Sequence, residues 1–287
     1  DFNYWSDRAD NGKTYSIFRK EVYRMAGNSR RTVIKIDNVV KKYETRKGEV
    51  LALSNVNMEI KENEFICVVG PSGCGKSTLL NMVAGLLEPT EGHIYVNEKE
   101  VEGTGVERGV VFQQYALFPW LTVLKNVEYA PKLKGMKGKE LEEEALKYLR
   151  MVDLEQFAHS YPKELSGGMK QRVAIARAYA ARPQVLLMDE PFGALDAQTR
   201  TQLQSELIET WEKEQKTCFF ITHDVEEAII LATRVVIMSA RPGRIKEIVD
   251  VDIPYPRTQE TKMTPRFLEI KNHIWSEVYK EYLEVRK

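Results

Sequence analysis

The sequence lacks any run of about 20 mostly apolar residues, the length that a helix needs to cross a bilayer. The longest candidate, residues 228–238, is shorter and is interrupted by Thr233 and Arg234. Residues 1–10 are polar and acidic, so we expect no secretory signal peptide there. Together these absences favour a chain that does not enter the bilayer.

Cysteine is scarce, and neither sign of charge is in excess. The three cysteines, Cys67, Cys74 and Cys218, are odd in number and lack the spacing of a metal site, so we interpret them as reduced thiols of a cytosolic protein. Acidic and basic residues number 42 each. A general nucleic-acid binder usually carries a basic excess. We therefore expect no nucleic-acid partner, although a local basic patch remains compatible with this balance.

The first 31 residues are mostly polar and resemble an extension rather than part of the core. Within them Tyr15, Phe18, Val22 and Met25 recur at helical spacing, which predicts one amphipathic helix. Such a segment is either a mobile tail or a helix that docks on a partner or on a membrane surface.

Most of the chain alternates short apolar runs with helical patterns. Residues 65–69 form a continuous apolar run typical of a buried strand, and a glycine-rich loop and an apolar helix over 78–87 follow. The pattern resumes later as helices over 168–181, 197–214 and 225–232 and strands over 185–188, 217–221 and 234–238. This alternation predicts an α/β fold, with a parallel sheet that carries helices on its faces.

Three other segments depart from this alternation. Alternating apolar residues predict short strands over 32–36 and 52–60, on either side of a polar turn. Residues 120–165 show helical periodicity and indicate a helical insertion. After a proline-bearing stretch, a helix is predicted over 265–285.

The strongest motif is a loop that matches G-x-x-x-x-G-K-[ST] in full. Its residues are Gly70, Pro71, Ser72, Gly73, Cys74, Gly75, Lys76, Ser77 and Thr78. Glycines let such a loop turn its amide N–H groups toward phosphate oxygens, and the helix that follows adds its positive dipole end. Lys76 is expected to reach the β- and γ-phosphates and Ser77 to coordinate Mg²⁺. A chance match is disfavoured because a strand precedes the loop and a helix follows it.

A second motif places two carboxylates, Asp189 and Glu190, at the end of the apolar run 185–188. A buried strand cannot hold a carboxylate at low cost, so this pair indicates a cation or a charged ligand. We expect Asp189 to complete the Mg²⁺ site and Glu190 to polarise the attacking water.

A third motif, residues 165–172, opens a helix with the turn Ser166, Gly167 and Gly168. Such a turn can form a second anion-binding site. Ser166 is equally explained as a simple helix cap without a ligand. Capping alone does not explain the two glycines or the basic residues behind them.

These three motifs and a later histidine occur in the order and approximate spacing of the nucleotide-binding subunit of ABC transporters, which residues 32–241 resemble. The resemblance implies a P-loop NTPase (RecA-like) core with an antiparallel β subdomain and an inserted α-helical subdomain, at about 115–170. It leaves 1–31 and 242–287 as extensions. It also implies that two chains enclose two ATP molecules, so that Ser166, Gly167 and Gly168 bind the γ-phosphate held by the opposite subunit.

The same resemblance assigns roles to four further residues. Tyr43 occupies the position of an aromatic that stacks on adenine, although the residue could equally be an ordinary strand residue. Gln113 corresponds to a glutamine that contacts Mg²⁺ and the water, and His223 to a histidine that contacts the γ-phosphate. Asp196 belongs to a loop, residues 194–196, that crosses the dimer seam. With Glu190, we take Gln113 and His223 as the catalytic residues; with Ser77 and Asp189, Gln113 is a metal ligand.

Segments 118–123, 239–245 and 253–257 further resemble the nitrate/sulfonate/taurine group of bacterial importers. This implies a peripheral subunit on the cytoplasmic face of the cell membrane that drives integral permease subunits fed by a solute-binding protein. The apolar cluster 117–121 is then either a permease contact or ordinary core. The catalytic motifs are equally compatible with an exporter or lipid-trafficking complex. A soluble ATPase of translation or DNA repair is disfavoured, because the chain has one phosphate loop and a short insertion.

Overall fold

The structure is a computed structural model that describes residues 30–46, 48–193, 195–214 and 216–285. The amphipathic helix predicted around Tyr15, Phe18, Val22 and Met25 lies outside these residues. Among the described residues, every helix is too short or too polar to cross a bilayer.

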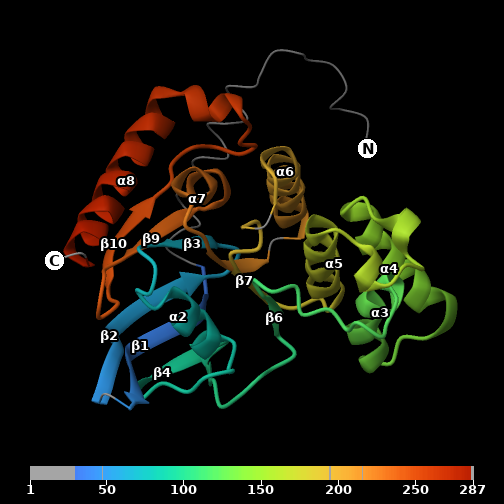
Figure 1. Ribbon diagram of the computed structural model, residues 1–287, viewed down its shortest axis with the longest axis horizontal. Coiled ribbons are helices and arrows are strands. Elements are labelled where there is room, and N and C mark those ends of the chain that lie inside the picture. Colours follow the sequence, from blue (N-terminus) through green and yellow to red (C-terminus); the bar gives the residue numbers. More distant parts are fainter. Residues whose placement is uncertain (1–29, 47, 194, 215, 286–287) are drawn as a thin grey trace, which may run out of the picture.

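A six-stranded sheet forms the centre of the molecule, in the order β10-β9-β3-β8-β7-β6 (Figure 1). Five of its strands are parallel, and β10 runs antiparallel to β9 at one edge. The bounds are β3 Phe65–Val69, β6 Arg108–Val111, β7 Val185–Asp189, β8 Thr217–Ile221, β9 Arg234–Met238 and β10 Ile245–Asp250. The parallel sheet predicted from the alternation is therefore confirmed, whereas β6 and β10 were not predicted.

The central strands are buried on both faces, and their alternate residues feed two separate cores. Phe65 and Cys67 of β3 belong to a core with the helices α5, α6, α7 and α8, whereas Ile66 and Val68 belong to a core with α2 and the second sheet. Because side chains alternate across a strand, a continuous apolar run is what a strand between two cores needs. The helices are α2 Lys76–Val83, α5 Gly167–Ala180, α6 Ala197–Glu214, α7 Val225–Leu231 and α8 Pro265–Val285.

The second sheet is antiparallel, with the order β2-β1-β4-β5. Its strands are β1 Thr32–Thr45, β2 Gly48–Lys61, β4 Glu91–Val96 and β5 Lys99–Glu100. The predicted strands 32–36 and 52–60 are thus parts of longer ones. The paired ends of β1 and β2 are mostly exposed, so they lack the apolar alternation by which a strand is recognised.

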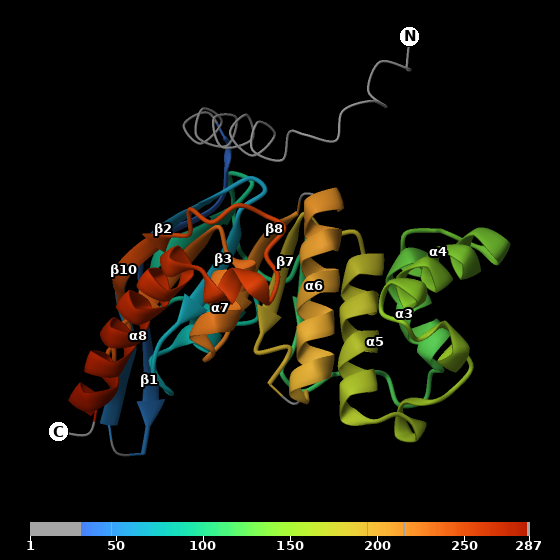
Figure 2. The same ribbon diagram turned by 90° about the horizontal axis from the view of Figure 1, so that it is seen from above.

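The inserted helices lie beyond α5, at the opposite end of the molecule from α8 (Figure 2). They are α3 Val123–Leu133 and α4 Gly138–Met151, with short 3₁₀ turns at Glu155–Phe157 and Pro162–Glu164 and another, Glu260–Met263, before α8. Thr122 caps α3, because its side chain accepts a hydrogen bond from the Lys125 amide. Leu141, Ala145 and Leu149 are the buried stripe of α4, as the helical spacing predicts.

The predicted helices α6 (197–214) and α8 (265–285) are found with their predicted bounds. The helix predicted over 78–87 is wrong at both ends: α2 begins at Lys76 and ends at Val83. Gly85 turns the chain with a φ of +74°, and a Cβ atom there would lie 1.9 Å from the carbonyl oxygen of Gly103. The helix therefore stops where the backbone must pass close to another segment.

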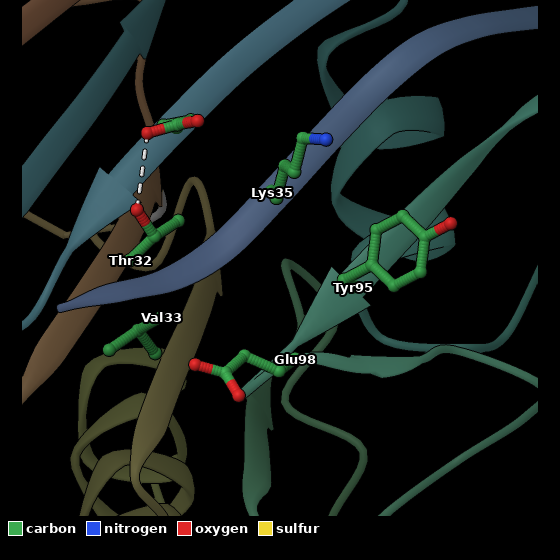
Figure 3. Close-up of a pocket in the computed structure, with 6 residues that line it drawn as sticks. Thr32, Val33, Lys35, Tyr95 and Glu98 are labelled. Carbon is green, nitrogen blue, oxygen red and sulfur yellow. Dashed lines mark hydrogen bonds between the residues drawn. The ribbon is translucent and has the colours of Figure 1, made fainter.

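A hollow of about 450 Å³ lies on the antiparallel sheet. It is lined by Thr32, Val33, Lys35, Glu59, Tyr95 and Glu98, and the Thr32 hydroxyl donates a hydrogen bond to the Glu59 carboxylate across it (Figure 3). None of the predicted site residues lines this hollow. The candidate site described below is elsewhere, at the carboxyl edge of the parallel sheet.

Candidate functional site

The phosphate-loop motif connects β3 directly to α2, as the sequence predicts. Gly75 precedes the helix with a φ of +97°, and a Cβ atom there would lie 2.5 Å from Cδ2 of Leu53. Only glycine fits such a position without moving a neighbour. The first amide groups of α2 have no partner within their own helix, so the loop and helix offer donors to an anion.

Lys76 is buried against its own loop. Its ammonium group donates hydrogen bonds to the carbonyl oxygens of Gly70 at 2.8 Å and Pro71 at 3.1 Å. Within the part of the chain that the structure describes, no carboxylate lies within ion-pair distance of Lys76. Its positive charge interacts with the Asp189 carboxylate from beyond ion-pair distance and remains available to a phosphate ligand.

Ser77 and Asp189 meet at the carboxyl edge of the parallel sheet. The Ser77 hydroxyl donates a hydrogen bond of 3.2 Å to Oδ1 of Asp189, the last residue of β7. Burial raises the pKa of Asp189, the hydrogen bond from Ser77 lowers it and the neighbouring Glu190 raises it, with a net rise. A hydroxyl and a carboxylate are hard oxygen ligands of the kind that Mg²⁺ uses together with waters and substrate phosphates, so this pair fits the predicted metal.

Two of the predicted catalytic residues converge on a carboxylate oxygen of the third. Oε2 of Glu190 lies 3.1 Å from Nδ1 of His223 and 3.5 Å from Nε2 of Gln113. Gln113 follows β6, Glu190 follows β7 and His223 follows β8. Because β6, β7 and β8 are adjacent and parallel, their carboxyl ends bring these side chains to the same edge.

The backbone at Glu190 is itself strained. Its φ is +45°, a left-handed conformation that non-glycine residues rarely adopt. The turn is held because the Glu190 amide donates to the carbonyl of Ile221 and the Gly193 amide donates to the carbonyl of Glu190. Strain of this kind persists where surrounding contacts over-determine it, and it is frequent at functional sites.

Tyr43 lies beside the phosphate-loop helix. Its hydroxyl is 3.4 Å from that of Thr78, and its side chain remains 37% exposed on β1. The ammonium group of Lys41 lies 5.3 Å from the ring centroid. The ring is therefore available at the edge of the phosphate loop, where the family resemblance predicts an aromatic that stacks on adenine.

The Ser166 turn lies elsewhere. Figure 1 shows α5, which the turn opens, on the other side of β7 from α2. Ser166 is exposed, and its hydroxyl caps α5 by accepting a hydrogen bond from the Met169 amide. A Cβ atom at Gly167 would lie 2.9 Å from the Tyr115 hydroxyl, and one at Gly168 would lie 3.1 Å from Leu195. The capping interpretation is thus met, and the turn's outer side stays open.

Asp196 caps the next helix. Its Oδ1 accepts hydrogen bonds from the amides of Gln198 and Thr199, at the first turn of α6. These bonds lower the pKa of Asp196. The loop 194–196 is only partly described, because residue 194 lies outside the described residues.

One neighbour of the phosphate loop was missed from the sequence. The loop 239–244, which follows β9, brings Gly243 against the carbonyl of Cys74, and Met238 at the end of β9 lies against Gly70. Its signal was the position of strand 234–238 beside β3, because parallel neighbours end at one edge. In the sequence this segment stands out only by its resemblance to an importer group.

The chain is similar to known proteins along most of its length. The sequence profile of the family described as ABC transporter matches residues 53–193. An uncharacterized ABC transporter ATP-binding protein of Methanocaldococcus jannaschii is 53% identical over 88% of this chain and 94% of its own. The nitrate import ATP-binding protein NrtD of Synechocystis sp. is 50% identical over 80% and 89%. The aliphatic sulfonates import ATP-binding protein SsuB of Bacillus cereus is 45% identical over 84% and 94%.

Solved structures give the same result for the fold. The ATP-binding cassette MJ0796, in a dimeric post-hydrolysis state bound to ADP and Pi, matches with a TM-score of 0.71 and 37% identity. The match covers 77% of this chain and 100% of the cassette. The predicted fold class, a P-loop NTPase core with mixed α/β sheets and inserted helices, is therefore confirmed.

Proposed function

Because this chain belongs to the ABC transporter family and is an ATP-binding ATPase of that family, we propose that it is the motor subunit of a bacterial ABC importer. In this proposal ATP closes a dimer of motors and hydrolysis reopens it. The motion drives permease subunits in the cell membrane, and a solute-binding protein delivers the cargo. The chain would lie at the cytoplasmic face of that membrane.

The observation that carries the chemistry is the convergence of Gln113 and His223 on Glu190. We assign Glu190 the role of polarising the water that attacks the γ-phosphate, since it is the carboxylate that both neighbours contact. His223 would contact the γ-phosphate, and Gln113 would orient the water. Lys76 and the loop amides would hold the β- and γ-phosphates.

Mg²⁺ would be held by Ser77, Asp189 and Gln113. When bound, the ion offsets the negative charge on the β- and γ-phosphates. The chain's own contribution is to keep Ser77 and Asp189 within hydrogen-bond distance of each other at the end of β7.

We propose that the Ser166 turn completes the site of a second copy. Its hydroxyl and the Gly167 and Gly168 amides would bind the γ-phosphate held by the other chain's Lys76 loop. Support comes from its exposure and from the dimeric state of the related cassette with ADP and Pi. Each ATP would then be gripped from both sides, and hydrolysis would remove the shared contact.

The permease contact is proposed on the inserted helices. Trp120 is 71% exposed and Leu133 is 73% exposed, and Tyr129 lies between them in sequence on α3. Phe118 packs 4.6 Å from the ring of Tyr129 and under the guanidinium of Arg177. An exposed aromatic cluster of this kind is typical of an interaction surface.

A buried asparagine holds this surface in shape. The side-chain oxygen Oδ1 of Asn126 accepts a hydrogen bond from the Phe118 backbone amide. Its side-chain nitrogen Nδ2 donates to the carbonyls of Phe118, Leu121 and Thr122. The segment 118–121 is therefore fixed to α3 rather than free. Of the two earlier interpretations of cluster 117–121, we propose permease contact for its exposed part.

We propose that the cargo is nitrate, a sulfonate, taurine or a similar small solute. The proposal rests on NrtD and SsuB, which are named as import proteins for nitrate and aliphatic sulfonates. The chain itself would not touch this solute.

The experiment is to purify the chain in complex with its permease, reconstitute both in vesicles, and measure ATPase rate and uptake. Nitrate, taurine and an alkanesulfonate are each supplied with the cognate solute-binding protein. We expect one of them to raise the ATPase rate and to accumulate inside. Export of a lipid or of a solute from the same vesicles, with no import, would overturn the importer assignment in favour of an exporter.

A further inference from the structure

The loop 239–244 between β9 and β10 supports the phosphate loop from behind. A Cβ atom at Gly243 would lie 1.9 Å from the carbonyl oxygen of Cys74, so the two backbones are in direct contact. On its other side Gly243 pairs with β2: its amide donates to Ala52, and its carbonyl accepts from Ser54. Met238, just before the loop, packs its carbonyl against Gly70. The loop is thus wedged between β2 and the phosphate loop.

The final helix reaches this loop with a buried carboxylate. Glu281 of α8 is 5% exposed. Its Oε2 accepts a hydrogen bond of 2.9 Å from the Ala240 amide, and its Oε1 accepts one of 2.6 Å from the Lys246 ammonium on β10. Burial raises the pKa of Glu281, but the bonds from Lys246 and Ala240 outweigh it and lower the pKa overall. The carboxylate therefore stays charged and bonded.

Packing alone does not require this glutamate. Phe267, Ile270 and Ile274 already bury the inner face of α8 in the core. A buried charge is costly unless its partners satisfy it, and Glu281 has two such partners. Besides its ion pair with Lys246, Glu281 supplies an acceptor for a backbone amide in the loop that supports the phosphate loop.

We propose that Glu281 is a positioning residue for nucleotide binding. By holding Ala240, it fixes the loop 239–244, and this loop keeps Cys74 and Gly70 in the geometry that binds phosphate. Free movement of the loop would reduce the pre-organisation of the phosphate-binding amides, and affinity would fall because the ligand must then order them. Arg241 belongs to the same loop, and its guanidinium lies 3.6 Å from where a Cβ atom of Gly73 would be. This inference deepens the ATP-site part of the proposed function and is independent of the importer assignment.

The test measures ATP and ADP affinity of the full chain by calorimetry, together with KM and kcat. In Glu281→Ala both bonds are lost, and we expect Kd and KM for ATP to rise about fivefold to tenfold, with kcat within about twofold. In Glu281→Gln the amide oxygen can still accept from Ala240, so we expect affinity close to wild type. The matched control is Glu277→Gln, which removes the ion pairs with Lys246 and Lys280 but no bond to the loop.

A purely structural role would lower the melting temperature without changing Kd. If Glu281→Ala fails to fold, Glu281→Asp keeps the charge but shortens its reach, and we expect a smaller rise in Kd. Wild-type Kd in a folded Glu281→Ala or Glu281→Asp protein, or an equal rise in Glu277→Gln, overturns the inference. Since these measurements need no permease or solute, their failure is distinct from failure of the importer proposal.

Discussion

Two turns of the chain open helices in similar ways, yet their surroundings differ. The phosphate loop before α2 has Lys76 buried within it and Ser77 bonded to Asp189, with Tyr43 and the loop 239–244 against it. The Ser166 turn before α5 is exposed and has one capping bond of its own. The first is nearly complete within one chain. The Ser166 turn instead leaves its side chain exposed, as we expect for a site that a second chain completes.

The largest effect is expected at Glu190, the carboxylate beside the phosphate-loop site. Glu190→Gln removes the base but keeps its size, so turnover should fall by about 10²- to 10⁴-fold while ATP affinity stays close to wild type. ATP should then hold the two chains together, and dimers should accumulate. The measurements are single-turnover hydrolysis and light scattering with and without ATP. Hydrolysis near the wild-type rate would remove Glu190 from its assigned role.

The next effect, at Lys76 of the phosphate loop, separates ATP binding from ATP hydrolysis. Lys76→Ala removes an ammonium group whose hydrogen bonds to phosphate, as bonds to a charged group, are worth about 1.5–3 kcal/mol. Kd for ATP should therefore rise about tenfold to a hundredfold, measured by calorimetry on the full chain. Lys76→Arg, which keeps the charge, is the control. Unchanged affinity in Lys76→Ala would mean that the loop amides alone bind the phosphates.

The Ser166 turn is tested by adding a negative charge while the cap of α5 is kept. Aspartate and asparagine both cap helices well, so Ser166→Asp and Ser166→Asn should leave α5 folded. Only the aspartate adds a negative charge where we propose a γ-phosphate. We expect Ser166→Asp to lose ATP-dependent dimers and at least about tenfold of the ATPase rate, with ATP affinity of the monomer unchanged. Equal behaviour of the two variants would leave Ser166 as a helix cap alone.

Part of the site could be recognised from the sequence. The resemblance to a known family assigned Gln113 and His223 to the site of Glu190, and the structure brings the three side chains together, although the strand before Gln113 was not predicted. Buried runs such as Phe65–Val69 were recognised because a strand between two cores must be apolar throughout.

Features that depend on contacts between distant segments were not predicted. The bond from the Ala240 amide to Glu281 joins residues 41 positions apart, and no local pattern marks either one. The left-handed backbone at Glu190 and the early end of α2 at Val83 are set by neighbouring segments and not by propensity. The exposed parts of β1 and β2 were not predicted, because strands without a buried face show no alternation of apolar and polar residues.

The smallest effect is expected at Tyr43, which lies partly exposed at the edge of the phosphate loop. Stacking of an aromatic ring on a base contributes about 1–3 kcal/mol in nucleic-acid complexes, and partial exposure favours the low end here. Tyr43→Ala should therefore raise KM for ATP several-fold with kcat unchanged, whereas Tyr43→Phe, which keeps the ring and loses the contact with Thr78, should behave like wild type. Comparison with inosine triphosphate in both variants separates ring stacking from other base contacts. An equal loss in both variants would make the hydroxyl contact to α2, and not the ring, the reason for tyrosine at this position.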